Sequence, residues 1–206
     1  MMRAFIICGT DTGIGKTIVA SMLTVALDAH YWKPIQSGIE DGTDTQRVQA
    51  LTGLSNDRFL PERYILSRPL SPHLAAELDG VEISELFLPK MDITLIIEGV
   101  GGLMVPITRR KLQIDIFKEW AIPVILCAST GLGTINHTLL SIEALHKRKI
   151  VLRGVIFIGH DNPDTIQTIA DFSSAPVLGH VPYLDVIEYA TLLEVFAKRF
   201  LKEDFA

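Results

Sequence analysis

A glycine-rich loop that ends in lysine and threonine is the first candidate for chemistry. Its sequence, GTDTGIGKT, runs from Gly9 to Thr17 and directly follows an apolar run at 4–8. Glycines let successive backbone amides point at phosphate oxygens, and the start of a helix adds partial positive charge. In such a loop Lys16 reaches the β- and γ-phosphates and the threonine hydroxyl binds Mg²⁺. The first glycine is one position earlier than in the strict GxxxxGK(S/T) pattern, where Thr10 now lies, but the loop still predicts a nucleotide-phosphate site.

Two carboxylates are candidate magnesium ligands. Glu98 ends the apolar run 94–97 and precedes the glycine-rich stretch 99–102. Mg²⁺ takes oxygen ligands and is commonly held by one or two carboxylates. A carboxylate at the tip of a buried strand beside a phosphate loop fits that role. Asp44, within GTDT, is the second candidate, and its alternative interpretation is an N-cap for the next helix.

A lysine opens the segment KPIQSG, which begins at Lys33. The segment follows the strand-like piece 30–35, so its loop is expected to face the same nucleotide. A lysine there would stabilise the negative charge of a transferring phosphoryl group. Position alone leaves an ordinary surface lysine equally open.

Alternating apolar runs and helical patterns must position these side chains. Apolar runs without alternation are typical of strands buried on both faces. The alternation of strand and helix patterns along the chain favours an α/β fold, in which a parallel β-sheet is flanked by helices. We expect a single domain that spans 1–206 and is similar to the P-loop NTPases. Ligands of such sheets bind at the carboxyl ends of the strands. The expected strands are 4–8, 30–35, 94–97, 123–128, 155–158 and 176–178, the expected helices are 17–29, 135–146 and 192–201, and 56–90 is expected to be irregular.

Composition excludes several classes of protein. The chain has 206 residues, 48% of them hydrophobic and 21% charged, which is ordinary for a globular domain and excludes wholesale disorder. A formal charge of −5 argues against a nucleic-acid partner, and the basic clusters 109–111 and 146–149 are short. The apolar runs are too short for a membrane span or signal peptide. Cys8 and Cys127 each adjoin an apolar run and are expected to be buried thiols, so we expect a cytoplasmic protein with no membrane partner.

Six stretches of the chain form a pattern over nearly its whole length. In chain order they are GTDTGIGKT, KPIQSG, the Asp44 region, SPH at 71–73, EGVGG from Glu98 and LGTINH at 132–137. The phosphate loop alone is generic, whereas the other stretches at these spacings are specific. Together they resemble one family, the dethiobiotin synthetases of biotin biosynthesis, and the late turn 181–184 resembles the family's nucleotide-binding turn.

The resemblance implies an ATP-dependent ligase that is a homodimer. Its substrates would be 7,8-diaminopelargonate and CO₂, with ATP as co-substrate and Mg²⁺ as cofactor. One amine captures CO₂ as a carbamate, the carbamate attacks the γ-phosphate, and the second amine displaces phosphate to close a cyclic urea.

The resemblance also implies site residues. Lys33 and Lys16 would be catalytic, and Thr17, Asp44 and Glu98 would hold the metal. The helix start at 132–137 would receive the substrate carboxylate across the dimer interface, with Thr134 as N-cap. Nucleotide contacts would come from Gly13, Ile14, Gly15, Lys16, Thr17, Ile18, Asp44, Glu98, Gly99, Val100, Gly101, Ile158, Gly159, Pro182, Tyr183 and Leu184. Substrate contacts would come from Thr12, Ser37, Pro72, Gly101, Thr134 and Asn136.

One position departs from the family pattern. Members commonly carry an asparagine that reads adenine after the strand at 155–157, and this chain has Ile158 there. An isoleucine offers adenine no hydrogen bond, so backbone groups, His160 or Asn162 would have to replace it. We therefore expect weaker discrimination between bases, so that other nucleoside triphosphates can also serve.

Three other classes of protein compete with this interpretation. MinD- and ParA-type ATPase switches carry a second lysine five residues before the loop lysine, where this chain has Asp11. Their membrane-seeking tail would correspond to 193–201, but packing on the sheet explains that pattern better. Amidating ligases of the cobyrinic-acid synthase type need a glutaminase domain, for which we expect no room. A purely structural module leaves the phosphate loop unexplained.

Overall fold

Strand β1 (Arg3–Gly9) shows how the sheet is built. Its residues alternate between two cores: Phe5 and Ile7 pack into one cluster, while Ala4, Ile6 and Cys8 pack into the other. A strand covered on both faces has no need of polar alternation. The computed structural model describes residues 3–206.

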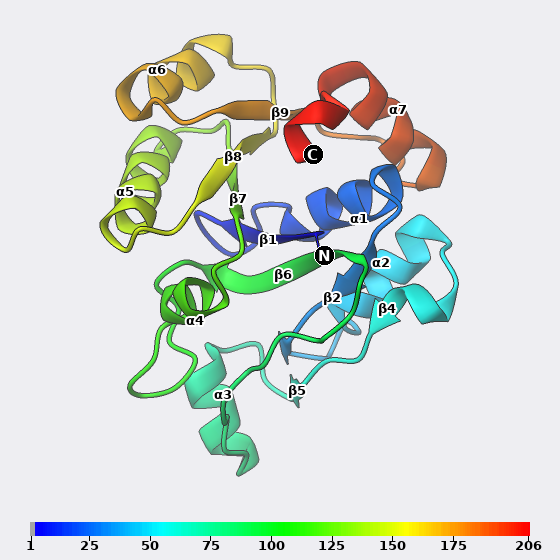
Figure 1. Ribbon diagram of the computed structural model, residues 1–206, viewed down its shortest axis with the longest axis vertical. Helices are drawn as coiled ribbons and strands as arrows, with labels where there is room; N and C mark the ends of the chain where they lie inside the picture. Colours follow the sequence, from blue (N-terminus) through cyan, green and yellow to red (C-terminus); the bar gives the residue numbers. More distant parts are fainter. Residues whose placement is uncertain (1–2) are drawn as a thin grey trace.

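The main sheet has seven strands in the order β4-β2-β6-β1-β7-β8-β9, and every neighbouring pair is parallel (Figure 1). This confirms the predicted parallel α/β fold. Besides β1, the strands are β2 (His30–Trp32), β4 (Phe59–Leu60), β6 (Thr94–Gly102), β7 (Val124–Ser129), β8 (Leu152–Ile158) and β9 (Val177–Val181).

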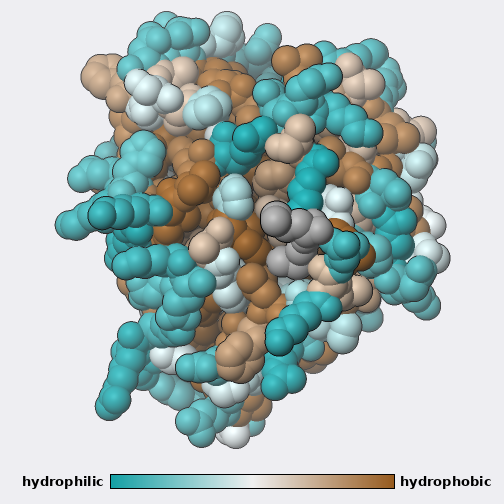
Figure 2. Space-filling view, in the orientation of Figure 1, coloured by the Kyte–Doolittle hydropathy of each residue, from teal (hydrophilic) through white to brown (hydrophobic). Residues whose placement is uncertain are grey.

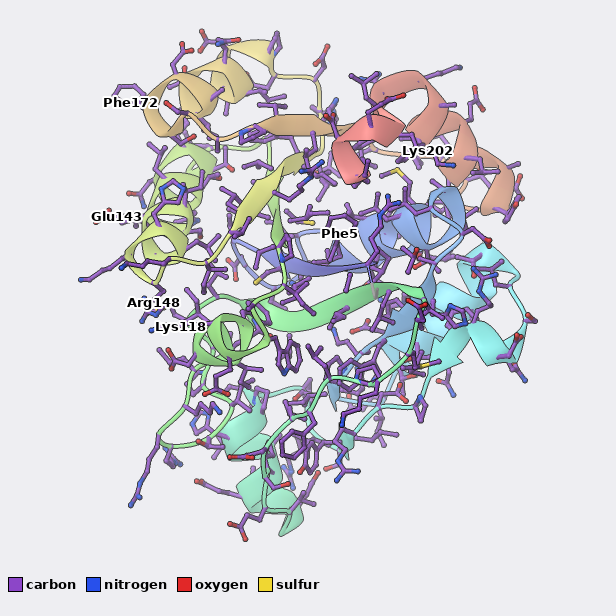
Figure 3. All side chains as sticks on the ribbon, in the orientation of Figure 1. Phe5, Lys118, Glu143, Arg148, Phe172 and Lys202 are labelled. Carbon is purple, nitrogen blue, oxygen red and sulfur yellow. The ribbon has the colours of Figure 1, made fainter. Side chains whose placement is uncertain are left out.

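Helices cover both faces of the sheet (Figure 1). One face carries α1 (Lys16–Ala26), α2 (Asp44–Thr52) and α7 (Tyr189–Arg199), whose apolar side chains share a core with Phe5 and Ile7. The other carries α4 (Gln113–Trp120), α5 (Thr134–Lys147) and α6 (Pro163–Ser173). In Figure 3, Phe5 lies inside the molecule, whereas Glu143 lies at its periphery.

Two predictions about the first half of the chain are wrong. The expected strand 30–35 is two strands, because Pro34 interrupts it: β2 joins the main sheet, while β3 (Ile35–Ser37) pairs with β5 (Tyr64–Leu66). The segment 56–90 is also not wholly irregular. It holds η1 (Asn56–Arg58), β4, β5 and α3 (Pro72–Asp79). Its Leu66, Ala75 and Ile83 pack into a separate core together with Ile35, Ile107 and Ile116.

The tail and the cysteines follow expectation. Helix α7 buries Leu192 and Phe196 in the shared core, and the chain continues to η2 (Lys202–Phe205), so its apolar stripe packs internally. Cys8 and Cys127 are buried free thiols, and burial raises the pKa of Cys8 to about 12. Within residues 3–206 no helix combines the length and apolar character needed to cross a membrane. Figure 2 shows hydrophilic side chains around the rim of one face, with hydrophobic residues toward its middle.

Candidate active site

The register of three parallel strands brings the predicted residues to one edge of the sheet. Ile7 of β1 pairs with Glu98 of β6, and Gly9 pairs with Gly102. Trp32, the last residue of β2, pairs with Ile97, so Lys33 begins its loop beside Glu98. The carboxyl ends of parallel strands meet at one edge. Residues far apart in sequence therefore meet here.

The phosphate loop joins the end of β1 to the start of α1. Gly15 precedes the helix with φ 100°, a left-handed conformation that favours glycine. A Cβ on Gly9 would lie 2.8 Å from the Asp11 carbonyl oxygen, which explains why a glycine is needed at this early position. Lys16 is buried and donates to that same carbonyl at 2.9 Å. The loop thus folds around its own lysine.

Four polar side chains converge next to the loop. The Thr17 hydroxyl donates to Glu98 Oε1 at 2.9 Å and lies 3.4 Å from Asp44 Oδ1. The Lys33 ammonium lies 2.8 Å from Asp44 Oδ2 and 3.1 Å from Glu98 Oε1, and it also donates to the Gly99 carbonyl at 3.1 Å. Lys33 is 3% exposed and Glu98 is 1% exposed, so both charges are buried with compensation.

Burial and mutual attraction oppose each other in the pKa values of this cluster. Burial acts to lower the pKa of Lys33, but the charges of Glu98 and Asp44 outweigh it and leave the pKa raised. Burial acts to raise the pKa of Asp44, but Lys33 outweighs it and leaves the pKa lowered. The lysine is therefore protonated and the aspartate ionised at neutral pH.

These donors fit a magnesium ion. Thr17, Asp44 and Glu98 offer hard oxygen atoms within one small region, and two carboxylates plus a hydroxyl match the partial protein coordination that Mg²⁺ accepts. Residues 3–206 hold no cluster of three or more His, Cys, Asp or Glu side chains suited to a metal. The alternative interpretation of Asp44 as the N-cap of α2 is wrong. Thr43 caps that helix, and its hydroxyl accepts from the Gln46 amide. The Asp44 carboxylate faces the polar cluster instead.

A cavity of about 360 Å³ opens over this cluster. Most of the residues predicted from the sequence to surround phosphate, metal and substrate line it. Two further lining residues, Gln36 and Arg47, were not predicted. The predicted lining residues are Thr12, Gly13, Ile14, Gly15, Lys16, Thr17, Ile18, Lys33, Ser37, Asp44, Glu98, Val100 and Gly101.

The two unpredicted residues differ in role. Gln36 is buried and connects two parts of the cavity: it accepts from the Asp44 amide at 3.0 Å and donates to the Gly38 carbonyl at 2.9 Å. Arg47 lies on the exposed rim of α2, where its charge helps to lower the pKa of Asp44. Next to Gln36, the Ser37 hydroxyl oxygen is buried with no hydrogen-bond partner among residues 3–206. An unpaired buried hydroxyl at a cavity is suited to bind a ligand.

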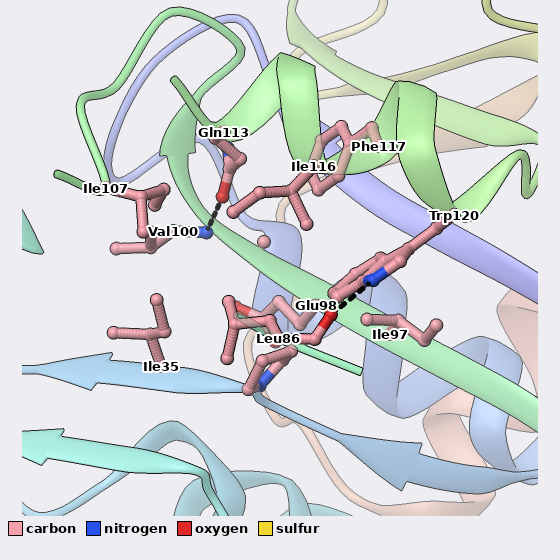
Figure 4. Close-up of a pocket in the computed structure, with 12 residues that line it drawn as sticks. Ile35, Leu86, Ile97, Glu98, Val100, Ile107, Gln113, Ile116, Phe117 and Trp120 are labelled. Atoms are coloured by element: carbon pink, nitrogen blue, oxygen red, sulfur yellow. Dashed lines mark hydrogen bonds between the residues drawn. The ribbon is translucent and has the colours of Figure 1, made fainter. Parts of the chain in front are cut away.

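Strand β6 continues past Glu98 to Gly102, so Glu98 is not at the strand tip as expected, and Gln113 holds this glycine-rich end of the strand (Figure 4). This buried side chain accepts from the Val100 amide at 2.6 Å and donates to the Gly102 carbonyl at 2.9 Å. Between these two contacts Gly101 has φ +63°, and a Cβ there would lie 2.9 Å from Val105. Gln113 lies at the start of α4. Together with Trp120 of the same helix, it lines a small apolar cavity of about 20 Å³ between α4 and β6. No local motif in the sequence identifies it.

Three predicted substrate residues lie apart from this cavity. Pro72 is the buried first residue of α3 and is not among its lining residues. Thr134 and Asn136 line a separate hollow at the start of α5. The prediction that Thr134 caps this helix is wrong: Gly133, with φ 93°, is the cap residue, and the Thr134 hydroxyl donates to the Ser129 carbonyl at 2.6 Å.

The predicted base-binding residues lie at the end of β8 and directly after β8 and β9. A Cβ on Gly15 would lie 3.2 Å from Ile158 Cγ2, so the Ile158 side chain faces the phosphate loop. The Gly159 amide donates to Val181, immediately before Pro182-Tyr183-Leu184, and Leu184 packs against the core. The Tyr183 ring is exposed, and its centroid lies 4.8 Å from the centroid of the His160 ring.

Asn162 is not free to replace the missing asparagine. Its side chain caps α6 by accepting from the Thr165 amide at 3.3 Å, and it donates to the Thr130 carbonyl at 3.1 Å. Of the three replacements considered, His160 and the backbone groups remain.

Comparison with solved structures supports the fold. MinD from Pyrococcus horikoshii OT3, complexed with Mg-ADP, matches with a TM-score of 0.54 at 16% identity, over 94% of this chain and 86% of that one. A ParA family ATPase from Chlorobium tepidum TLS matches with a TM-score of 0.54 at 12% identity, over 95% and 89%. Identities this low show a shared fold alone.

Sequence comparison is more specific. A family profile described as an AAA domain matches residues 3–191. The ATP-dependent dethiobiotin synthetase BioD of Rhodopseudomonas palustris (strain TIE-1) is 54% identical over 207 residues, which cover 100% of this chain and 98% of the relative. The protein of the same name from Agrobacterium fabrum (strain C58 / ATCC 33970) is 52% identical over 207 residues, with the same coverage. With matches that span both partners almost end to end, and with the phosphate loop and its polar cluster in place, this chain belongs to the family of ATP-dependent dethiobiotin synthetases.

Proposed function

We propose that this protein closes a cyclic urea on 7,8-diaminopelargonate with CO₂ and ATP, giving dethiobiotin. The observation that carries the proposal is the convergence of Thr17, Lys33, Asp44 and Glu98 beside the phosphate loop. The names and full-length identity of its relatives support the same reaction. Similarity to MinD and ParA extends only to the fold and favours no switch function.

The loop from Gly13 to Ile18 would hold the triphosphate. Its amides and the start of α1 provide positive potential, and Lys16 would exchange its contact with the Asp11 carbonyl for phosphate oxygens. Gly99, Val100, Gly101, Ile158, Gly159 and the turn Pro182-Tyr183-Leu184 would contact the rest of the nucleotide.

Thr17, Asp44 and Glu98 would hold Mg²⁺, which supplies positive charge to the phosphate oxygens when bound. In the protein without ligands, the Lys33 ammonium balances Asp44 and Glu98. A cation shared by these carboxylates would reduce their hold on the ammonium. Lys33 would then be available to the negative charge that develops during phosphoryl transfer.

The reaction itself needs no protein nucleophile. One amine of the substrate adds to CO₂ and loses a proton, giving a carbamate. A carbamate oxygen attacks the γ-phosphorus, ADP leaves, and a carbamic–phosphoric anhydride forms. The second amine attacks the carbonyl carbon and displaces phosphate, which closes the ring. Holding both amines beside one carbon makes the last step intramolecular, an advantage of about 7–11 kcal/mol in well-oriented systems.

Thr12, Ser37 and Gly101 would bind the diamine, because they line the cavity that also holds Lys33. The unpaired Ser37 hydroxyl suits an amine or a carbamate oxygen. Pro72, Thr134 and Asn136 lie outside this cavity. Their proposed role depends on a homodimer, in which the start of α5 of one protomer would meet the substrate of its partner. We place the reaction in the cytoplasm, where ATP is available.

The test is phosphate release with ATP, Mg²⁺ and bicarbonate, in the presence and absence of 7,8-diaminopelargonate. We expect release only with the diamine, and a product with the mass of the cyclic urea. Equal release without the diamine would contradict the synthetase function and favour a regulatory ATPase. Size-exclusion chromatography with light scattering tests the homodimer separately.

A further inference from the structure

Tyr31 lies behind the proposed metal ligands and is not part of the phosphate loop or the cavity lining. It belongs to β2, its exposed fraction is 0%, and its ring packs against that of Phe59 at 6.2 Å between centroids. Its hydroxyl donates to Glu98 Oε2 at 2.8 Å. A buried polar tip at the end of a packed ring is thus aimed at a single carboxylate oxygen.

The two oxygens of Glu98 therefore have different partners. Oε1 accepts from the Thr17 hydroxyl at 2.9 Å and from Lys33 at 3.1 Å, on the side where Asp44 also lies. Oε2 is occupied by Tyr31 on the other side. Because Glu98 is 1% exposed, bulk water does not compete for either oxygen. The carboxylate is fixed with one oxygen directed to the polar cluster.

We propose that Tyr31 is a positioning residue that makes Glu98 a one-oxygen ligand and so favours Mg²⁺ over Ca²⁺. This inference rests on the proposed magnesium site. Mg²⁺ requires near-octahedral geometry, whereas Ca²⁺ takes six to eight oxygens and accepts both oxygens of one carboxylate. Hydrogen bonds to a metal ligand orient that ligand and tune the affinity for the metal. Removing the hydroxyl frees Oε2 and relaxes the discrimination.

The variant Tyr31→Phe tests this, because it keeps the ring and its contact with Phe59. The matched control is Tyr64→Phe, which removes a tyrosine hydroxyl bonded to Ser84 at 2.8 Å in the small sheet. The full chain is titrated with Mg²⁺ and with Ca²⁺ in the presence of a non-hydrolysable ATP analogue, by calorimetry. We expect Tyr31→Phe to lower the ratio of Mg²⁺ to Ca²⁺ affinity by about 10-fold, and Tyr64→Phe to leave it unchanged.

The outcomes are distinct. If the wild-type protein binds Mg²⁺ and Tyr31→Phe keeps the same ratio, the role of Tyr31 is overturned while the proposed function stands. If the wild-type protein with the analogue binds no Mg²⁺, the metal site and the role of Tyr31 fall together. Thermal unfolding checks that both variants fold.

Infrared difference spectra of the wild-type protein, labelled with ¹³C-glutamate, provide a measurement that needs no variant. The separation of the two carboxylate stretching bands distinguishes a one-oxygen from a two-oxygen ligand. A one-oxygen signature on addition of Mg²⁺ supports the proposal, and a two-oxygen signature overturns it.

Discussion

Lys33 and Glu98 are 65 residues apart in the chain, yet Lys33 Nζ lies 3.1 Å from Glu98 Oε1. The parallel pairing of β2 with β6 produces this contact, because it sets Trp32, the last residue of β2, opposite Ile97, the residue before Glu98. The ammonium also balances Asp44, so one buried cation serves two carboxylates. The chemistry of the site depends on this arrangement.

Removing the Lys33 charge is expected to abolish most of the activity. In Lys33→Met the diamine-dependent rate of phosphate release should fall by about 100-fold or more, because one preorganised positive group aimed at developing charge is lost. Nucleotide binding should change far less, since Lys16 and the loop amides remain. The control is Lys198→Met, which removes an exposed lysine paired with Glu194. A Lys33→Met rate within threefold of wild type would refute a catalytic role.

The ion pair of Lys33 with Asp44 predicts how the stability of the protein depends on pH. The pKa of Asp44 lies below its ordinary value of 3.8. The ionised Asp44 side chain therefore adds to the free energy of unfolding above pH 3.8, and this contribution is lost as pH falls through the lowered pKa. The pKa of Lys33 lies above its ordinary value of 10.5. The protonated Lys33 side chain therefore adds to the free energy of unfolding below pH 10.5, and this contribution is lost as pH rises through the raised pKa.

Urea unfolding of wild type and Lys33→Met across pH tests this window. Without Lys33, burial raises the pKa of Asp44 instead of leaving it lowered. The difference in unfolding free energy between the two proteins should therefore be largest from neutral pH to pH 10.5, and shrink both as pH falls into the acid range and as it rises above 10.5. A difference that instead varies steadily across neutral pH would show that other groups govern the coupling.

The Thr17 hydroxyl is expected to contribute to metal binding. Thr17→Val removes the hydroxyl with little change in shape, and Mn²⁺ affinity in the presence of ADP, followed by electron paramagnetic resonance, should fall by about 10-fold or more. Thr24→Val is the matched control, because Thr24 lies in the same helix and its hydroxyl donates to the Ala20 carbonyl. Equal Mn²⁺ affinity in Thr17→Val and wild type would remove Thr17 from the ligand set.

Base discrimination is expected to be weak. Ile158 faces the phosphate loop with no polar group, and Asn162 is already engaged by Thr130 and Thr165. Rates with ATP, GTP and CTP should therefore be of similar size, and Ile158→Asn should raise the preference for ATP by roughly 5- to 10-fold, the value of one net hydrogen bond. Activity with ATP alone in the wild-type protein would contradict this prediction.

Gln113 is expected to stabilise the glycine-rich end of β6, after Glu98. Gln113→Leu leaves the Val100 amide and the Gly102 carbonyl without this partner, which should lower the unfolding free energy by about 1–3 kcal/mol. The KM for the diamine should rise as the end of β6 loosens. The control Gln167→Leu removes an exposed glutamine bonded to Asp171 and should change neither quantity. Unfolding in urea and steady-state kinetics measure the two effects.

Much of this site could be predicted from local sequence. The phosphate loop is contiguous, and glycines, a lysine and a threonine at fixed spacing carry their chemistry with them. Glu98 could be identified because a charge at the end of an apolar run is unusual. The parallel sheet followed from alternating strand and helix patterns, since buried parallel strands are continuously apolar. The family resemblance then assigned roles that spacing alone leaves open.

Other features were decided only by the tertiary structure. Tyr31, Gln36 and Gln113 look like ordinary strand, loop and helix residues in the sequence, and each acquires its role through a partner brought near by folding. The division of 30–35 between two sheets is likewise non-local, as is the core that joins residues of 56–90 to Ile35, Ile107 and Ile116. The physical reason is that a motif within one segment depends on short-range spacing, whereas strand register and helix packing choose the neighbours of a side chain, and those neighbours determine what a tyrosine hydroxyl or a glutamine amide can do.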